Sequence, residues 1–148
     1  MGLTNKPKAI GTRAETAVVR YLRAELEDDR IERRALHGSK DMGDIFGLYA
    51  HGHSGIAEVK AHKTWGPKDL YGWQMQTLDE RDNADADFAL LVVKVPNRNV
   101  SQWLAYVTIR DLARVCRSLS VSTDFEGTYD DVWVCMTLRD AARMMKGV

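Results

Sequence analysis

Apolar side chains recur at helical spacing near the start of the chain, and charged residues occupy the positions between them. Thr12 followed by Glu15 has the form of a capping box, in which the threonine hydroxyl accepts from an amide of the first turn. This pattern predicts an amphipathic helix over residues 12 to about 27, packed through one side. The apolar residues of that side are Val18, Val19, Tyr21, Leu22 and Leu26.

The next apolar segments have the length and the flanking residues of β-strands. Residues 45–50 and 56–61 are separated by a short segment, residues 51–55, that contains two glycines, and this predicts a β-hairpin. Because side chains alternate along a strand, Glu58 and Lys60 should share one face with Ile56. Ala57 and Val59 should lie on the opposite face, which is small and apolar enough to pack on helices.

The remaining pattern predicts further strands and helices. Residues 68–81 suit a helix, the apolar run 88–95 suits a buried central strand, and residues 102–107 suit another strand. Near the end, two similar segments each read as a strand and a helix, capped by Thr108 or Thr137 with an aspartate three residues later. Residues 118–131, between these two units, are polar and are expected to form a loop.

These elements together predict an α/β fold with a mixed central β-sheet flanked by helices. The core should follow the order α-β-β-α-β over about residues 8–110, and a strand–helix extension should cover about residues 111–148. With 148 residues, of which 45% are hydrophobic, the chain suits a single domain.

Composition and charge indicate the compartment of the protein and the kind of ligand that its surface could bind. No run of about 18 apolar residues is present, and the first residues lack the apolar centre of a secretory signal, so we expect a cytoplasmic protein without a membrane partner. Cys116 and Cys135 lack metal-site spacing and are expected to be buried free thiols. Net charge is zero, but residues 1–68 carry 12 basic against 9 acidic side chains. A polyanion would meet that half, although an ordinary solvated surface explains the offset equally well.

The predicted hairpin brings a carboxylate to the Glu58 and Lys60 face. Asp44 stands at the start of the first strand, which a hairpin places beside the end of the second. Mg²⁺ prefers oxygen ligands and is commonly held by one or two carboxylates, here Asp44 and Glu58, to which the backbone carbonyl of Val59 could be added. Lys60 would position an attacking water or stabilise negative charge. This constellation suits hydrolysis of a phosphodiester.

The order of these motifs resembles the PD-(D/E)XK nuclease superfamily, and within it the archaeal-type Holliday-junction resolvases and their phage relatives. The resemblance covers roughly residues 8 to 95. It rests on Gly11-Thr-Arg-Ala-Glu15, Gly38-Ser-Lys-Asp-Met-Gly-Asp44-Ile, Glu58-Val-Lys60, a helix with Gln74, and the apolar strand after it. Gly43 stands where the superfamily name would place proline, and the last fifty residues have no clear counterpart.

The resemblance implies roles for individual residues. It implies that Asp44 and Glu58 bind the metal, that Lys60 is catalytic, and that Glu15 is the family's helix-1 glutamate and a possible further ligand. A capping role would also explain Glu15. Gln74 falls where many members have a glutamine, but an error in helix register would exchange it for Gln76. Residues beside the motifs are candidates for DNA phosphate contacts, or serve solubility alone: Arg13, Ser39, Lys40, Lys63 and Lys68.

The function implied is that of a Mg²⁺-dependent DNA endonuclease, with Mn²⁺ as a substitute, acting on Holliday junctions or other branched DNA in a bacterial or phage-infected cell. A homodimer is implied as well, because a resolvase cuts two symmetry-related strands. A flap, nicking or restriction-like endonuclease remains an alternative. A DNA-binding or assembly module that keeps the fold without cleavage is an alternative from another class.

Overall fold

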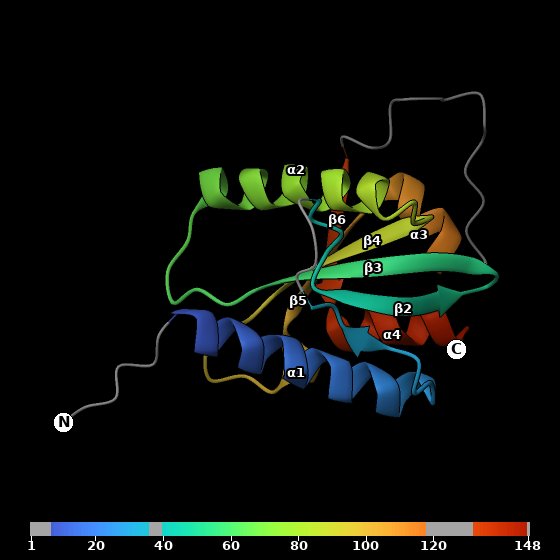
Figure 1. Cartoon of the computed structure of the whole chain (residues 1–148), viewed down its shortest axis with the longest axis horizontal. Helices are drawn as coiled ribbons and strands as arrows, with labels where there is room; N and C mark the ends of the chain where they lie inside the picture. Colours follow the sequence, from blue (N-terminus) through green and yellow to red (C-terminus); the bar gives the residue numbers. More distant parts are fainter. Residues whose placement is uncertain (1–6, 36–39, 118–131, 148) are drawn as a thin grey trace.

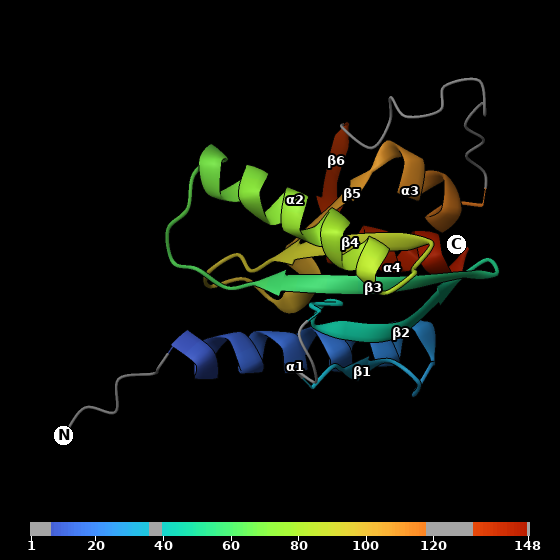
Figure 2. The same ribbon diagram turned by 45° about the horizontal axis from the view of Figure 1, so that its top comes forward.

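A six-stranded β-sheet lies between two layers of helices in the computed structural model, which describes residues 7–35, 40–117 and 132–147 (Figure 1). Helices α1 and α4 cover one face of the sheet, and α2 and α3 cover the other (Figures 1 and 2). The elements in chain order are α1 Pro7–Leu26, β1 Glu32–Arg33, β2 Ile45–Ala50, β3 His53–Lys60, α2 Pro67–Asn83, β4 Phe88–Val93, the 3₁₀ helix η1 Val100–Gln102, β5 Leu104–Thr108, α3 Ile109–Val115, β6 Trp133–Thr137 and α4 Leu138–Lys146.

The sheet is mixed, as the sequence predicted. Its strands lie in chain order from β1 to β6, and every neighbouring pair is antiparallel except β3 and β4. Those two strands are parallel, and α2 is the crossover helix that connects them, as a parallel pair requires. All six residues of β4 are buried, which confirms the expected central strand. The predicted α/β class is therefore confirmed.

Helix α1 begins earlier than predicted, and the proposed capping box at Thr12 is wrong. The helix starts at Pro7, a residue that suits a first turn because its missing N–H would be unpaired there in any case. Thr12 therefore lies inside the helix, where its backbone carbonyl accepts a hydrogen bond from Thr16 Oγ1 at 2.9 Å. The carboxylate of Glu15 does not cap the helix, so it can form contacts with residues outside α1.

The hairpin of β2 and β3 is tighter than predicted, because its turn consists of His51 and Gly52, both with positive φ. The register of the hairpin shifts between Ile45 and Leu48. Gly47 lies in this irregularity at φ +83°, and a Cβ there would stand 2.2 Å from the carbonyl oxygen of Arg30. A glycine is thus required where β2 passes close to the preceding segment.

The two C-terminal strand–helix units form as predicted. Thr108 Oγ1 accepts from the amide of Asp111 at 3.1 Å, and Thr137 Oγ1 accepts from the amide of Asp140 at 3.1 Å. The loop predicted between the units, residues 118–131, lies outside the described residues. Helix α4 buries one side in the same hydrophobic cluster as α1, through Leu138, Ala141, Ala142 and Met145. The predicted extension therefore completes the core rather than merely adding to its edge.

Replacing Thr137 by alanine is expected to lower the free energy of unfolding by about 1 kcal/mol, because the amide of Asp140 loses its capping acceptor. Urea unfolding followed by circular dichroism measures this change. The matched control is Thr137→Ser, which keeps the hydroxyl and should stay within about 0.5 kcal/mol of the wild type. Equal loss in both variants would mean that the methyl group, not the cap, stabilises α4.

Two further expectations concern the compartment of the protein. Neither Cys116 nor Cys135 forms a disulfide within the described residues. Cys116 is half-buried and Cys135 is exposed, so the prediction of buried thiols is wrong for Cys135. The cause is the position of Cys135 on β6, the last strand of the sheet, where its side chain points outward. Within the described ranges, no helix has the length and apolar character needed to cross a membrane.

Candidate metal-binding and catalytic site

A pocket of about 770 Å³ opens between α1, α2 and the ends of β2 and β3. Asp44, Glu58 and Lys60 all line it, and Glu15 and Gln76 face it from the two helices. The three residues that the sequence placed at the centre of the site are thus brought together, as the hairpin geometry predicted.

Backbone contacts on both sides of Asp44 fix its position at the entry to β2. Its amide donates to the carbonyl of Ala57 at 3.1 Å, and its carbonyl accepts from the amide of Arg34 at 2.7 Å. Its Oδ2 accepts from the amide of Val59 at 2.9 Å. Because three backbone groups hold this residue, its carboxylate is pre-positioned beside β3, with little freedom left to lose on binding a ligand.

The alternation of β3 separates an apolar face from a charged one. Ala57 and Val59 belong to the hydrophobic cluster beneath α1. Glu58 points to the other side and is only 3% exposed, while Lys60 at the end of the strand is half-buried. A carboxylate this deeply buried needs a proton, a cation or hydrogen-bond donors to offset its desolvation.

Gln76, and not Gln74, is the glutamine of the site. Lys60 Nζ donates to Gln76 Oε1 at 2.9 Å, while Gln76 Nε2 donates to Glu80 Oε1 at 2.7 Å and to Glu58 Oε2 at 3.4 Å. Gln74 does not line the pocket, because two helical positions turn the side chain by roughly 200°. The structure therefore places Gln76, and not the predicted Gln74, at the pocket.

The inward face of α2 is polar, and this explains why the sequence did not distinguish Gln76 from Gln74. The buried residues of this helix are polar or charged: Thr77, Glu80 and Arg81. Gln76 and Glu80 are one turn apart, so the spacing of polar residues could have indicated this face, had burial of charge been allowed for. Glu80 and Asp41 were not among the residues predicted for the site.

Glu15 joins the site from the middle of α1, where it is half-buried. Its Oε2 accepts from Arg33 Nε at 2.9 Å. The pKa of Glu15 is raised, first by burial and then by the negative charge of Asp44, and the guanidinium of Arg33 opposes the shift. The structure thus brings Glu15 to the predicted site and leaves its capping interpretation without support.

The pKa values of three carboxyl groups at the pocket, Asp44, Glu58 and Glu80, are raised. Burial is the largest cause in each case, and it raises the pKa of Asp44 and of Glu58 to about 8 and that of Glu80 to about 7. Asp44 and Glu58 also hydrogen-bond each other, and this contact raises the pKa of Asp44 and lowers that of Glu58. Lys60 opposes both increases. A proton or a cation between the two carboxyl groups would offset their burial and their mutual repulsion.

The oxygen-rich donor set fits a hard divalent cation such as Mg²⁺ or Mn²⁺. Asp44 and Glu58 would hold it as predicted, Val59 lines the same pocket, and Glu15 stands next to Asp44. A buried oxygen, Glu80 Oε2, accepts no hydrogen bond within the described part of the chain. These observations agree with a site built for a cation, because a buried carboxylate oxygen without a donor is otherwise unfavourable.

The predicted phosphate-contacting residues are placed unequally. Arg13 and Lys63 line the pocket, and Lys40 lines an adjoining one of about 490 Å³ that also includes Glu15 and Asp44. Lys68 is exposed in the first turn of α2 and lines neither pocket. Ser39 lies outside the described residues.

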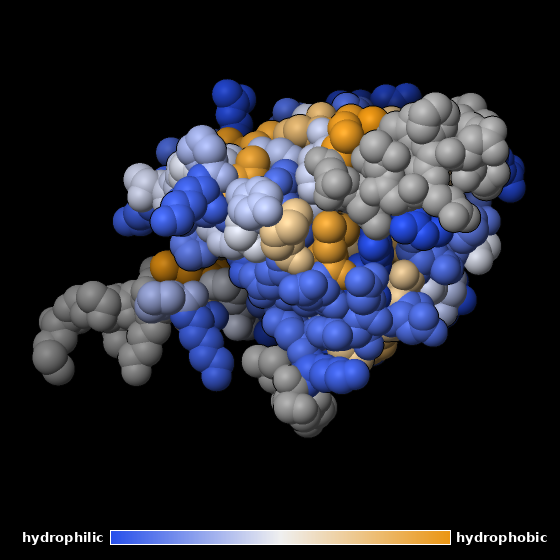
Figure 3. Space-filling view, turned by 90° about the horizontal axis from the view of Figure 1, so that it is seen from above, coloured by the Kyte–Doolittle hydropathy of each residue, from blue (hydrophilic) through white to orange (hydrophobic). Residues whose placement is uncertain are grey.

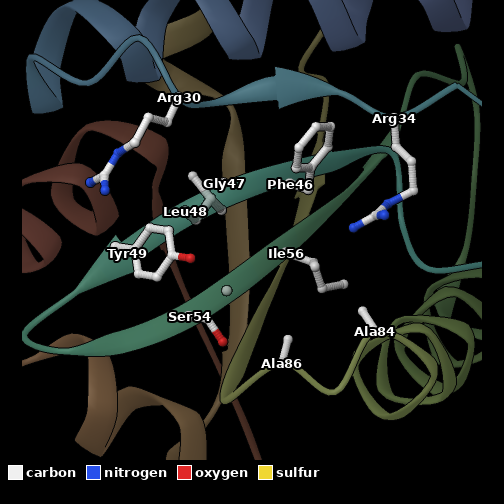
Figure 4. A pocket seen from close by; sticks show the side chains of 11 residues that line it. Arg30, Arg34, Phe46, Gly47, Leu48, Tyr49, Ser54, Ile56, Ala84 and Ala86 are labelled. Carbon is white, nitrogen blue, oxygen red and sulfur yellow. The ribbon is translucent and has the colours of Figure 1, made fainter.

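A third pocket, of about 420 Å³, lies on the outward face of β2 and contains cationic and aromatic side chains (Figure 4). The guanidinium of Arg30 lies 4.9 Å from the ring of Tyr49, and that of Arg34 lies 4.9 Å from the ring of Phe46. Arg34 also lines the pocket that contains Asp44 and Glu15. A surface with two arginines and two aromatic rings therefore continues from the carboxylates, a feature that the sequence analysis missed.

The outer surface over α2 is seen from above in Figure 3. It is mainly hydrophilic, with hydrophobic residues in small separate patches (Figure 3). The carboxylate pocket with its adjoining surface is thus the main candidate functional site. Comparison of the chain with family models, with curated proteins and with solved structures finds no match.

Proposed function

We propose that this protein is a divalent-metal-dependent endonuclease that hydrolyses DNA phosphodiester bonds at the pocket of Asp44, Glu58 and Lys60. The observation that carries the proposal is the convergence of the buried Glu58 and the half-buried Asp44 carboxyl groups, which hydrogen-bond each other, beside Lys60. Buried, coupled carboxyl groups with raised pKa values are typical of functional sites. The resemblance of the motif order to PD-(D/E)XK nucleases supports the same reaction class.

Each residue has a defined task in this proposal. Asp44 and Glu58 hold Mg²⁺ or Mn²⁺, with the Val59 carbonyl and Glu15 as further candidates. When bound, the cation lowers the pKa of a coordinated water and stabilises negative charge on the phosphate. Lys60 orients the attacking water or adds positive charge to the transition state.

The surroundings of these residues support the same tasks. Gln76 holds Lys60 through its carbonyl oxygen and Glu58 through its amide nitrogen. Arg13 and Lys63 at the pocket, Lys40 beside it, and Arg34 on the adjoining surface supply positive charge for the phosphates of a DNA strand.

Replacing Gln76 by alanine is expected to slow DNA cleavage by about 10- to 100-fold, because Lys60 loses its acceptor and two carboxylates lose a donor. Single-turnover cleavage at saturating Mg²⁺ measures this rate. Gln74→Ala is the matched control on the same helix, and it should stay within about twofold of the wild type. If Gln74→Ala slowed cleavage more than Gln76→Ala does, Gln74 rather than Gln76 would be the glutamine of the site.

The substrate class that we favour is branched DNA, and it rests on the resemblance to junction resolvases. The test is to incubate the protein and Mg²⁺ with a four-way junction, a flap and plain duplex of the same sequence. Preferential cutting of the junction at paired, symmetric positions supports a resolvase acting as a homodimer, and light scattering on the same sample gives the oligomeric state. Preference for the flap or for plain duplex rejects the resolvase and keeps the nuclease.

We place this activity in the cytoplasm of a bacterial or phage-infected cell. One observation supports the compartment: neither Cys116 nor Cys135 forms a disulfide within the residues that the structure describes. Free thiols suit a reducing compartment.

A further inference from the structure

Three carboxylates from three separate elements meet at the α2 side of the pocket. Asp41 lies in the segment before β2, Glu58 on β3 and Glu80 on α2. Each offers one oxygen, and these oxygens lie within 4.8 Å of one another. This group differs from the predicted ligand set, since it shares only Glu58 with it.

The carboxylate of Glu80 is the most deeply buried of the group and is incompletely paired. Glu80 is 1% exposed. Its Oε1 accepts from Gln76 Nε2 at 2.7 Å, whereas its Oε2 has no hydrogen-bond partner in the described part of the chain. The neighbours of Glu80 are the carboxyl groups of Asp41 and Glu58, so the side chain faces the cluster. A buried oxygen that faces other oxygens requires a positively charged ligand or a proton.

Hydrogen bonds hold Asp41 in place at this cluster. Asn83 Nδ2, at the end of α2, donates to the backbone carbonyl of Asp41 at 2.8 Å. The amide of Gly43 donates to Asp41 Oδ1 at 3.1 Å. The segment before β2 is thereby fixed to the last turn of α2, which carries Glu80, and the exposed Asp41 carboxylate gives the buried pair an opening to solvent.

We propose that Asp41, Glu58 and Glu80 form a second divalent-cation site, separate from the one at Asp44 and sharing Glu58 with it. An exclusively oxygen donor set selects hard cations, Mg²⁺ or Mn²⁺. Two cations that share a carboxylate can stabilise both the attacking and the leaving oxygen of a phosphodiester. That catalytic use rests on the proposed nuclease function, whereas binding of the second cation does not.

The experiment is a Mn²⁺ titration of the full chain without DNA, in which electron paramagnetic resonance measures free Mn²⁺. The wild type is expected to bind two Mn²⁺ per chain at saturation. Glu80→Gln, which keeps the shape of the side chain and removes its charge, should bind one. Asp41→Asn should weaken the second site by about 10-fold or more. Asp79→Asn removes an exposed charge next to Glu80 and is the matched control, so it should still bind two.

Equal numbers of bound Mn²⁺ in the wild type and in Glu80→Gln would overturn the second site. Circular dichroism checks that each variant is folded. If Glu80→Gln is not folded, the exposed Asp41→Asn decides, because an unchanged affinity for the second Mn²⁺ in that variant would overturn the second site. The second site and the nuclease function fail in distinguishable ways. If the wild type binds two Mn²⁺ per chain but cleaves no DNA, the nuclease function is rejected and the second site stands. If the protein cleaves DNA but the wild type and Glu80→Gln each bind one Mn²⁺ per chain, the second site is rejected and the nuclease function stands.

Discussion

Asp44→Asn and Glu58→Gln are each expected to slow DNA cleavage by about 1,000-fold or more at saturating Mg²⁺. Each substitution replaces a carboxylate by an amide of the same shape, so the pocket keeps its form and loses a charge. An amide oxygen binds a hard cation far more weakly than a carboxylate does, and the transition state loses the stabilisation that the cation supplies. Single-turnover cleavage of an end-labelled four-way junction measures the rate.

Controls for this pair separate loss of chemistry from loss of structure. The side-chain amide in the Asp44→Asn variant would still present an oxygen to the Val59 amide, which Asp44 contacts at 2.9 Å, so the hairpin should keep its register. Asp79→Asn, an exposed acid of α2 outside the pocket, should cleave at the wild-type rate. If both active-site variants also cleave at that rate, the site is not catalytic. DNA binding with no cleavage by any of these proteins would favour the non-cleaving module.

The centre of the site could be predicted because it depends on local geometry. Alternation along one strand places Glu58 and Lys60 on a common face, and a hairpin returns to its own starting point, where Asp44 lies. Neither inference requires knowledge of distant packing. The pocket that these residues share is therefore where the sequence placed it.

The remainder of the site depends on helix boundaries and on contacts between distant segments. The start of α1 at Pro7 removes the capping interpretation that competed with the predicted position of Glu15 in the site. The orientation of α2 about its axis places Gln76, and not Gln74, at the pocket and directs Glu80 inward, because this helix buries polar groups against the sheet. The Asn83 contact that holds Asp41 joins residues 42 positions apart, and no local pattern indicates it.

In the two C-terminal strand–helix units, too, local features could be predicted from the sequence and long-range packing could not. Thr108 and Thr137 were identified as caps because capping is a matter of three neighbouring residues. The packing of α4 against α1 was not predicted. It depends on contacts between segments far apart in the chain. Another long-range contact joins α4 to the turn between β2 and β3, where His51 Nε2 lies 2.9 Å from the carbonyl oxygen of Met144. Neighbouring residues in the sequence thus determine where a helix begins, whereas the position of the helix in the fold depends on packing in the hydrophobic core.

Without divalent cations, the protein is expected to lose stability as pH rises from about 4 to about 8. Burial raises the pKa of Asp44 and Glu58 to about 8 and that of Glu80 to about 7, from ordinary values near 4. Over that range the folded state holds protons that the unfolded state releases, so the free energy of unfolding falls with pH and levels off above about pH 8. The total loss should be at least about 3 kcal/mol, or a fall in Tm of roughly 6–12 °C. Thermal unfolding in a chelator at a series of pH values measures it.

Divalent cations and variants that remove a carboxylate should both reverse this loss of stability at high pH, because each removes uncompensated negative charge from the pocket. Mg²⁺ takes the place of the protons, so its stabilising effect on Tm should be larger at pH 8.5 than at pH 6, where protons compete for the carboxylates. Glu58→Gln needs no proton to remain buried, so in chelator its Tm should depend less on pH and exceed that of the wild type at pH 8.5. The variant that abolishes cleavage should thus stabilise the metal-free fold. A wild-type Tm that rises between pH 5 and pH 8 in chelator would contradict the raised pKa values.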